Sequence, residues 1–122
     1  MQIKYERLRV WSAAIDLSEQ IYSASRQFPR REDFGLTSQL RRAAVSVAAN
    51  IAEGSGRFHT REFINFLYVS RGSLFEVMTL LTLSLRLTYI APEEATRLRI
   101  KCEGLLAGLS ALLKGLERRT RH

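Results

Sequence analysis

The chain has few residues that could cross-link or rigidify a fold. Its 122 residues include one cysteine, Cys102, with two prolines, two histidines and one tryptophan. A single cysteine excludes a disulfide framework, and a chain of this length can bury roughly two-thirds of its unfolded surface without one. The sequence therefore predicts a single domain over residues 1–122 with one hydrophobic core, suited to a reducing compartment such as the cytoplasm.

Long apolar runs are also absent. The N-terminal segment MQIKYERLRVW has no apolar stretch of the kind that a secretory signal requires. The most apolar run, LFEVMTLLTLSLRLTYI at residues 74–90, is shorter than the roughly 20 residues of a membrane span and carries Glu76 and Arg86. We therefore expect no membrane partner and a cytoplasmic location.

No segment alternates apolar and polar residues as a β-strand does, whereas helical spacing covers most of the chain. Pro29, Pro92 and the glycines at 54 and 56 divide it into four helices, at about 8–27, 36–53, 61–89 and 92–118, with a basic tail at 118–122. Thr60 is the predicted N-cap of the third helix and Gly54 the residue that follows the second. Short connections then favour an all-α fold, an antiparallel up-down-up-down four-helix bundle.

One face of each predicted helix is apolar, and these faces form the predicted core. The core residues are Val10, Ala14, Leu17 and Ile21 of the first helix; Leu36, Leu40, Ala44, Val47 and Ile51 of the second; Phe63, Leu67, Leu74, Met78, Leu81 and Leu85 of the third; and Ala95, Leu98, Cys102, Leu105, Leu109, Leu112 and Leu116 of the fourth.

Residue patterns for catalysis, metal or cofactor binding are missing. His59 stands alone in a turn, and no Glu-x-x-His motif of a di-iron bundle occurs. Cys102 falls on the apolar face of its helix, which is typical of a small core residue. The GSGR segment lacks the lysine and spacing of a phosphate-binding loop. We therefore predict a protein that is not an enzyme, with no cofactor.

A polar stripe interrupts the second helix, whose residues 41–56 read RRAAVSVAANIAEGSG. At about 100° per residue, its five polar members lie within about 40° of Ser46, flanked by the small residues Ala43 and Ala49. They are Gln39, Arg42, Ser46, Asn50 and Glu53. Small flanking residues let another helix approach closely, so we expect more than a solvated face.

The third helix has a second face beside its core face. That face holds Val69, Leu80, Leu83 and Leu87 together with the carboxylates Glu62 and Glu76. A surface helix needs only one apolar stripe, so a second one predicts self-association. The hypothesis is a polar seam in which Arg42 pairs with Glu53, Glu62 or Glu76, because buried polar groups must be paired. Such a seam would set register more than stability. The alternative is a partly solvated stripe of little energetic value.

The charge is strongly basic, with a net charge of +7 and sixteen arginines against three lysines. Arginine prefers planar partners such as phosphate and carboxylate. In an antiparallel bundle, the termini and the connection between helices two and three share one end. Seven arginines gather there: Arg7, Arg9, Arg57, Arg61, Arg118, Arg119 and Arg121. This end is the predicted nucleic-acid surface, acting through backbone phosphates.

Aromatic residues are few at this end, where only Tyr5 and Phe58 accompany the arginines. Contact with the phosphate backbone is therefore the better prediction, with base stacking a minor contribution. The competing interpretation is a purely structural protein-interaction oligomer, in which the arginines serve subunit contacts. Salt-dependent binding to RNA or DNA distinguishes the two.

Several motifs together resemble those of the four-helix-bundle proteins encoded in intervening sequences of bacterial 23S ribosomal RNA. They span roughly residues 8–90. They are Phe28-Pro29, Gly35-Leu36-Thr37-Ser38-Gln39, Arg42-Ala43, Asn50-Ile51-Ala52-Glu53-Gly54, and Gly72-Ser73-Leu74 with Glu76.

The resemblance implies a left-handed four-helix bundle that assembles as a ring-like homopentamer, and it brings no catalytic residues. The same fold occurs in the accessory variability determinant proteins of diversity-generating retroelements, which are basic pentamers that bind nucleic acid and partner a reverse transcriptase. This chain is more basic than the intervening-sequence pattern and poorer in acidic residues after Glu76, which favours the retroelement role. Its motifs match the intervening-sequence group better, so a reverse transcriptase partner is the alternative expectation.

Overall fold

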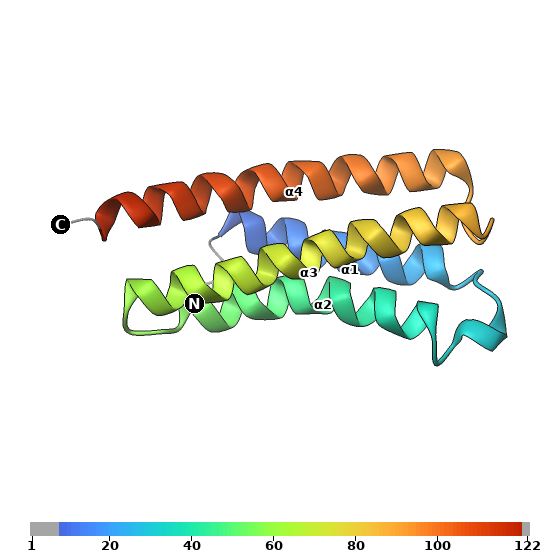
Figure 1. Cartoon of the computed structure of the whole chain (residues 1–122), viewed down its shortest axis with the longest axis horizontal. Coiled ribbons are helices and arrows are strands. Elements are labelled where there is room, and N and C mark those ends of the chain that lie inside the picture. Colours follow the sequence, from blue (N-terminus) through green and yellow to red (C-terminus); the bar gives the residue numbers. More distant parts are fainter. Residues whose placement is uncertain (1–7, 121–122) are drawn as a thin grey trace.

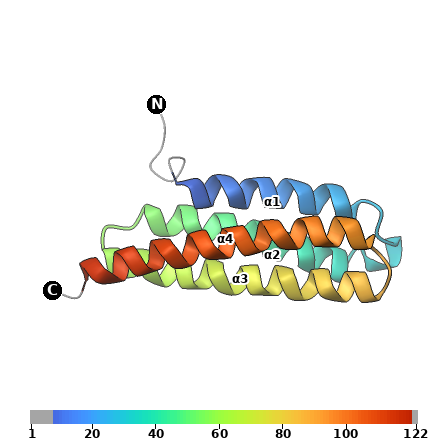
Figure 2. The same cartoon turned by 90° about the horizontal axis from the view of Figure 1, so that it is seen from above.

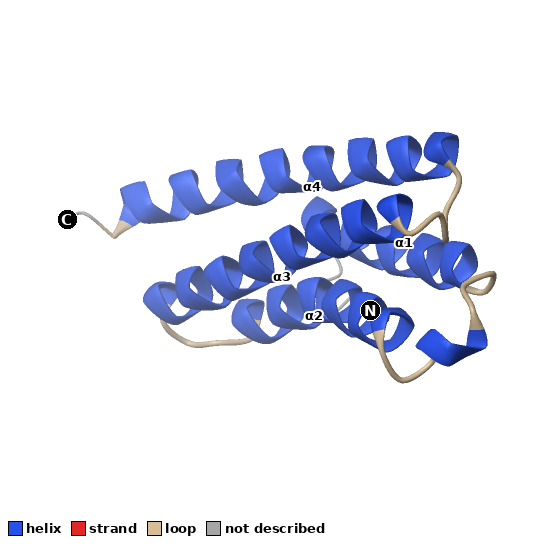
Figure 3. Ribbon diagram, turned by 45° about the vertical axis from the view of Figure 1, so that its right-hand side comes forward, coloured by secondary structure: helices blue, strands red, loops and turns tan. Residues whose placement is uncertain are grey.

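Four long helices run antiparallel, alternately up and down. The computed structural model describes residues 8–120, and within that range the elements are α1 (Arg9–Ser25), the short 3-10 helix η2 (Arg30–Glu32), α2 (Leu36–Ser55), α3 (Thr60–Arg86) and α4 (Pro92–Arg119) (Figure 1). Each long helix packs on two neighbours, in the order α1, α2, α3, α4 and back to α1. No strand occurs within residues 8–120 (Figure 3). The all-α four-helix bundle that the sequence predicted is therefore confirmed.

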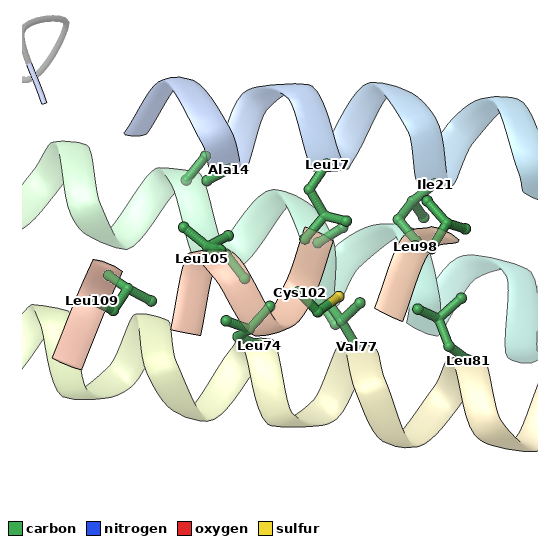
Figure 4. Close-up of a cluster of buried hydrophobic side chains, with 14 of the residues drawn as sticks. Ala14, Leu17, Ile21, Leu74, Val77, Leu81, Leu98, Cys102, Leu105 and Leu109 are labelled. Atoms are coloured by element: carbon green, nitrogen blue, oxygen red, sulfur yellow. The ribbon is translucent and has the colours of Figure 1, made fainter. Parts of the chain in front are cut away.

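The core lies where the four apolar faces meet. Leu17 and Ile21 of α1, Leu74 of α3, and Leu98 and Cys102 of α4 are at most 1% exposed, and all point into the bundle (Figure 4). One predicted core residue of α4, Leu112, is only partly buried, and its neighbour Leu113 takes the core position with 1% exposure. Leu85 of α3 is also 36% exposed, one residue before that helix ends.

The sequence predicted that Gly54 follows the second helix, but Gly54 lies inside α2. α2 continues to Ser55, and Gly56 takes the C-cap position with a right-handed φ of −85°. A Cβ on Gly54 would lie 2.6 Å from Cβ of Phe66 and 3.3 Å from the carbonyl oxygen of Phe63. The glycine is thus required by the close approach of α2 to α3, and not by a left-handed turn.

The second and fourth helices begin where the sequence predicted, at Leu36 and Pro92, and the remaining helix ends differ by one to three residues. His59, and not Thr60, occupies the N-cap position of α3, and its side chain makes no capping hydrogen bond. α3 ends at Arg86, three residues early, because Thr88 takes a left-handed φ of 64° that breaks the helix. α4 begins with Pro92 followed by Glu93 and Glu94, and ends with Arg118 and Arg119, as the helix dipole favours.

One carboxylate links the two connections at the end opposite the α2–α3 turn. Oε1 of Glu32 accepts a hydrogen bond from the backbone N–H of Leu36 at 3.1 Å, and Oε2 accepts one from the Tyr89 hydroxyl at 2.9 Å. These two donors, with the backbone N–H the stronger influence, hold the pKa of Glu32 below its ordinary value. Glu32 thereby caps α2 and connects it to the segment before α4.

Candidate nucleic-acid interface and polar seam

One end of the bundle collects the start of α1, the α2–α3 turn and the end of α4 (Figures 1 and 2). Five of the seven arginines predicted for the nucleic-acid surface lie here in exposed positions: Arg9, Arg57, Arg61, Arg118 and Arg119. Arg7 and Arg121 lie outside the described residues. We call these five residues the basic end. The antiparallel topology brings them together from three separate segments of the chain.

Arg57 differs from the other arginines of the basic end because its charge is engaged. Its Nη2 lies 2.8 Å from Glu53 Oε1, its Nη1 lies 4.0 Å from Glu62 Oε2, and its guanidinium lies 4.8 Å from the ring centroid of Phe66. Within residues 8–120 the other four arginines have no ion pair within 4.0 Å. Their charges are therefore available to a polyanion, whereas Arg57 holds the turn in place.

A groove of about 360 Å³ adjoins the basic end between α3 and α4. Its lining includes Arg61, Asn65, Glu117 and Thr120. One turn further along α3, the Tyr68 hydroxyl donates a 3.0 Å hydrogen bond to Glu117 Oε2, and this bond to a carboxylate raises the pKa of Tyr68. Sequence reasoning missed Asn65, which lines this groove, and Tyr68, whose hydrogen-bond partner Glu117 lies 49 residues away in the chain.

Ser46, at the centre of α2, is hydrogen-bonded directly to α3, and Asn50 binds Ser46 from within α2. The hydroxyls of Ser46 and Ser73 lie 2.8 Å apart, and Asn50 donates from Nδ2 to the backbone oxygen and hydroxyl of Ser46 at 2.8 and 3.0 Å. The buried Ser70 donates to the backbone oxygen of Val47 at 2.8 Å. These contacts fix α2 against α3, along the most extensive helix pair of the bundle.

The residues predicted to form the polar seam lie at two separate locations on α2 and α3. Gln39, Arg42, Ser46 and Glu76 line one open groove of about 400 Å³ between α2 and α3. Arg42 and Glu76 share that groove but form no ion pair within 4.0 Å. Glu53 and Glu62 do not join it, because they hold Arg57 at the α2–α3 turn. Within the protomer the seam is open to solvent, with Gln39, Arg42 and Glu76 exposed.

Two apolar surfaces also remain uncovered in the protomer. Along the outer face of α3 and at its C-cap, Val69, Leu83 and Leu87 are 54%, 44% and 42% exposed. Between α1 and α2, a groove of about 260 Å³ has an almost wholly apolar lining, formed by Trp11, Ile15, Ser18, Val45, Ala48, Ala49 and Ala52. We call the first the α3 ridge and the second the α1–α2 groove. They lie on adjacent sides of the bundle, since α2 packs against both α1 and α3.

Known proteins resemble this chain in sequence and in fold. The model of the 23S rRNA-intervening sequence protein family matches residues 6–111. The chain belongs to this family. A crystal structure of a protein of unknown function from the S23 ribosomal protein family of Bacteroides thetaiotaomicron has a TM-score of 0.81 at 21% identity, covering 92% of this chain and 99% of that one. At that identity the likeness establishes the fold. No curated protein matches the chain.

The chain shows no arrangement typical of catalysis within the residues described. His59 is an exposed turn residue whose ring packs edge-on against Phe58, with the two centroids 4.9 Å apart. Cys102 is fully buried, and burial raises the pKa of its thiol to about 11. Between residues 8 and 120, no group of three or more His, Cys, Asp and Glu side chains could hold a metal ion.

Helix α3 alone is long and apolar enough to cross a membrane by length and composition, among the helices described. Core helices of soluble proteins pass the same test. In this protein the Leu67, Leu74 and Leu81 side chains of α3 are buried in the bundle core, and Ser70 and Ser84 are buried with them. Part of the apolar character of α3 is thus used in packing, since 33% of its most apolar 18-residue window is buried.

Proposed function

We propose that this intervening-sequence protein is a non-enzymatic, self-associating bundle that binds nucleic acid through its basic end. The observation that carries the proposal is the set of four exposed arginines there, Arg9, Arg61, Arg118 and Arg119, that no carboxylate within residues 8–120 neutralises. Unpaired guanidinium groups at one end of a basic protein bind phosphates in either RNA or DNA, without reading sequence.

Self-association is the second part of the proposal, and the exposed apolar surfaces support it. The α3 ridge and the α1–α2 groove are complementary in character, one a row of aliphatic side chains and the other a concave apolar surface. Because they lie on different sides of one protomer, pairing ridge with groove is head-to-tail, which builds a ring when the rotation closes. A fivefold ring, as the family resemblance implies, would present the basic end five times.

The polar seam lies beside the α3 ridge, on the same side of the bundle. Arg42 and Glu76 face one groove without pairing. In the proposed assembly these two side chains meet partners from the neighbouring copy and fix its register. Arg42→Ala or Glu76→Ala should then weaken assembly, seen as a lower mass by light scattering at micromolar concentration.

Nucleic-acid binding is tested by fluorescence anisotropy with RNA and DNA oligonucleotides at several salt concentrations. The variant Arg118→Glu/Arg119→Glu should bind at least tenfold more weakly, and its affinity should depend less steeply on salt, since two phosphate contacts are lost. The matched control is Arg86→Glu/Lys101→Glu, which makes the same change in net charge at exposed positions away from the basic end. Equal loss in both variants, or no binding at low salt, would contradict the proposal.

The self-association is tested by light scattering on Val69→Glu/Leu83→Glu, which places two charges on the α3 ridge. This variant should dissociate to the protomer while keeping its helical circular dichroism. Ile100→Glu is the control, because Ile100 is 62% exposed on α4 and lies outside both apolar surfaces. A wild-type protein that is a folded protomer at micromolar concentration would refute this part.

A reverse transcriptase as partner, the retroelement role, stays a prediction from family resemblance. A reverse transcriptase gene beside this one would favour it, whereas insertion of the gene in a ribosomal RNA gene would favour the intervening-sequence role. Absence of binding to any nucleic acid at low salt would favour the third interpretation, a structural oligomer.

A further inference from the structure

Phe58, at the tip of the α2–α3 turn, is a large aromatic side chain that the protomer leaves uncovered. It is 93% exposed, and Phe34, at the opposite end, is the other phenylalanine exposed to a comparable degree, at 101%. Burying a phenylalanine is favourable by about 2 kcal/mol, so a fully exposed ring offers a partner that much gain on contact.

The turn that carries Phe58 is held firmly on both sides. The backbone N–H of Arg57 donates to the carbonyl oxygen of Gly54 at 3.1 Å, and the N–H of Glu62 donates to that of His59 at 3.1 Å. The Arg57 side chain bridges α2 and α3 through Glu53 and Glu62. His59 packs against the Phe58 ring at an interplanar angle of 90°. These hydrogen bonds and ion pairs fix the turn backbone, and the Phe58 ring points into solvent from it.

Charge distinguishes this ring from the exposed ring at the far end. Residues 57–61 read RFHTR and contain no acidic residue, and the guanidinium of Arg61 has no ion pair within residues 8–120. Residues 30–34 read RREDF, in which two arginines and two carboxylates give a formal charge of zero. Phe58 therefore lies in a segment of positive formal charge, three residues before the unpaired Arg61, whereas Phe34 lies in a segment with no net charge.

Polar hydrogen-bonding groups lie next to this charge. Arg61 also lines the groove of about 360 Å³ between α3 and α4, together with Asn65, Thr120 and Glu117, whose carboxylate accepts the hydrogen bond from Tyr68. A ring for stacking, a guanidinium for phosphate and an amide for a base edge are the three elements of a site for single-stranded nucleic acid. A duplex would offer phosphates to Arg61 but keep its base faces stacked within the helix.

We propose that Phe58 is a stacking platform for an unpaired base of single-stranded RNA or DNA, whose adjoining phosphate is contacted by Arg61. This inference rests on the proposed nucleic-acid function and narrows it to single strands. Base stacking then contributes more to binding than the low aromatic content of the sequence predicted, because the exposed Phe58 ring and the unpaired Arg61 lie in the same turn segment.

The test compares Phe58→Ala with Phe34→Ala in binding to a single-stranded oligouridylate and to a duplex of the same length, by fluorescence anisotropy. Phe58→Ala should weaken single-strand binding by about fivefold to a hundredfold, with an unchanged salt dependence since no charge is lost. Its duplex binding should not change. Phe34→Ala should bind both as the wild type does, and Phe58→Tyr should retain the affinity.

The outcomes separate this inference from the function on which it rests. If the wild type binds neither oligonucleotide, both fail. If binding is salt-dependent and requires Arg118 and Arg119, yet Phe58→Ala matches Phe34→Ala, only the stacking platform is overturned. Light scattering on Phe58→Ala completes the test. A mass lower than that of the wild type would make Phe58 a subunit contact and would also overturn the proposal that it stacks on a base.

Discussion

Replacing Gly54 with alanine tests the close approach of α2 to α3 at this position. The added Cβ would lie 2.6 Å from Phe66 Cβ, 3.0 Å from Phe63 Cδ1 and 3.3 Å from the Phe63 carbonyl oxygen. Neither a Cβ atom nor a backbone oxygen can rotate away, so α2 and α3 must move apart. Their separation would also strain the bonds of Ser46 to Ser73 and of Ser70 to Val47, which cross the same pair of helices.

The magnitude follows from two opposing effects. Overpacking of a well-packed contact destabilises a protein by about 1–3 kcal/mol, whereas alanine in place of glycine inside a helix stabilises it by about 1 kcal/mol. The net expectation for Gly54→Ala is a loss of up to about 2 kcal/mol in the free energy of unfolding. For a chain of this size that corresponds to a fall in Tm of several degrees, at about 4 °C per kcal/mol.

The matched control is Gly115→Ala in α4, where a Cβ would meet nothing within 4 Å. With no clash, this variant should be more stable than the wild type by about 0.5–1 kcal/mol. Urea unfolding and thermal melts followed by far-UV circular dichroism, at one fixed protein concentration, measure both variants. If Gly54→Ala is stabilised as much as Gly115→Ala, the close-approach explanation of Gly54 is wrong.

Two further predictions concern groups whose pKa is shifted. The buried Cys102 thiol, with its pKa raised to about 11, should not react with a thiol reagent at neutral pH in the folded protein but should react once urea unfolds it; fast native labelling would argue against a closed core at α4. The folded-state pKa of Glu32 lies below its ordinary value of 4.5, so its contribution to stability is present above that value and is lost as the pH falls through the folded pKa. Unfolding curves of Glu32→Gln should therefore show a smaller loss of stability on acidification than the wild type, and identical pH profiles would contradict the bridge to Leu36 and Tyr89.

The sequence predicted most of the fold because helical faces are set by local spacing. The predicted core positions of the first two helices are all buried in the structure. Leu112 was the exception in α4 because Leu112 and Leu113 follow Leu109 at spacings of three and four, and both fit one helical face. Which of the two faces the core depends on the rotation of the whole helix, and packing decided for Leu113.

The candidate site was predictable to a lesser extent. Topology alone brought the arginines to one end, but the sequence could not show that Arg57 is neutralised by Glu53 and Glu62 while Arg61 is not. The exposure of Phe58 could not be predicted either, since a phenylalanine in a turn can pack against the adjoining helices or point into solvent. Contacts of this kind depend on how two helices are shifted along their axes, which periodicity within one helix does not contain.

The sequence by itself determined four amphipathic helices, their order, and the excess of arginine, because each of these is a property of residues near one another in the chain. Only the tertiary structure decided that Gly54 is a point of contact between α2 and α3, and that Glu53 and Glu62 lie apart from Glu76. Only the structure, too, showed that Phe58 is exposed and that Arg61, three residues later, has no ion pair within residues 8–120. The physical reason is that these are relations between helices, fixed when a common core sets the distance, rotation and offset of each helix against the next.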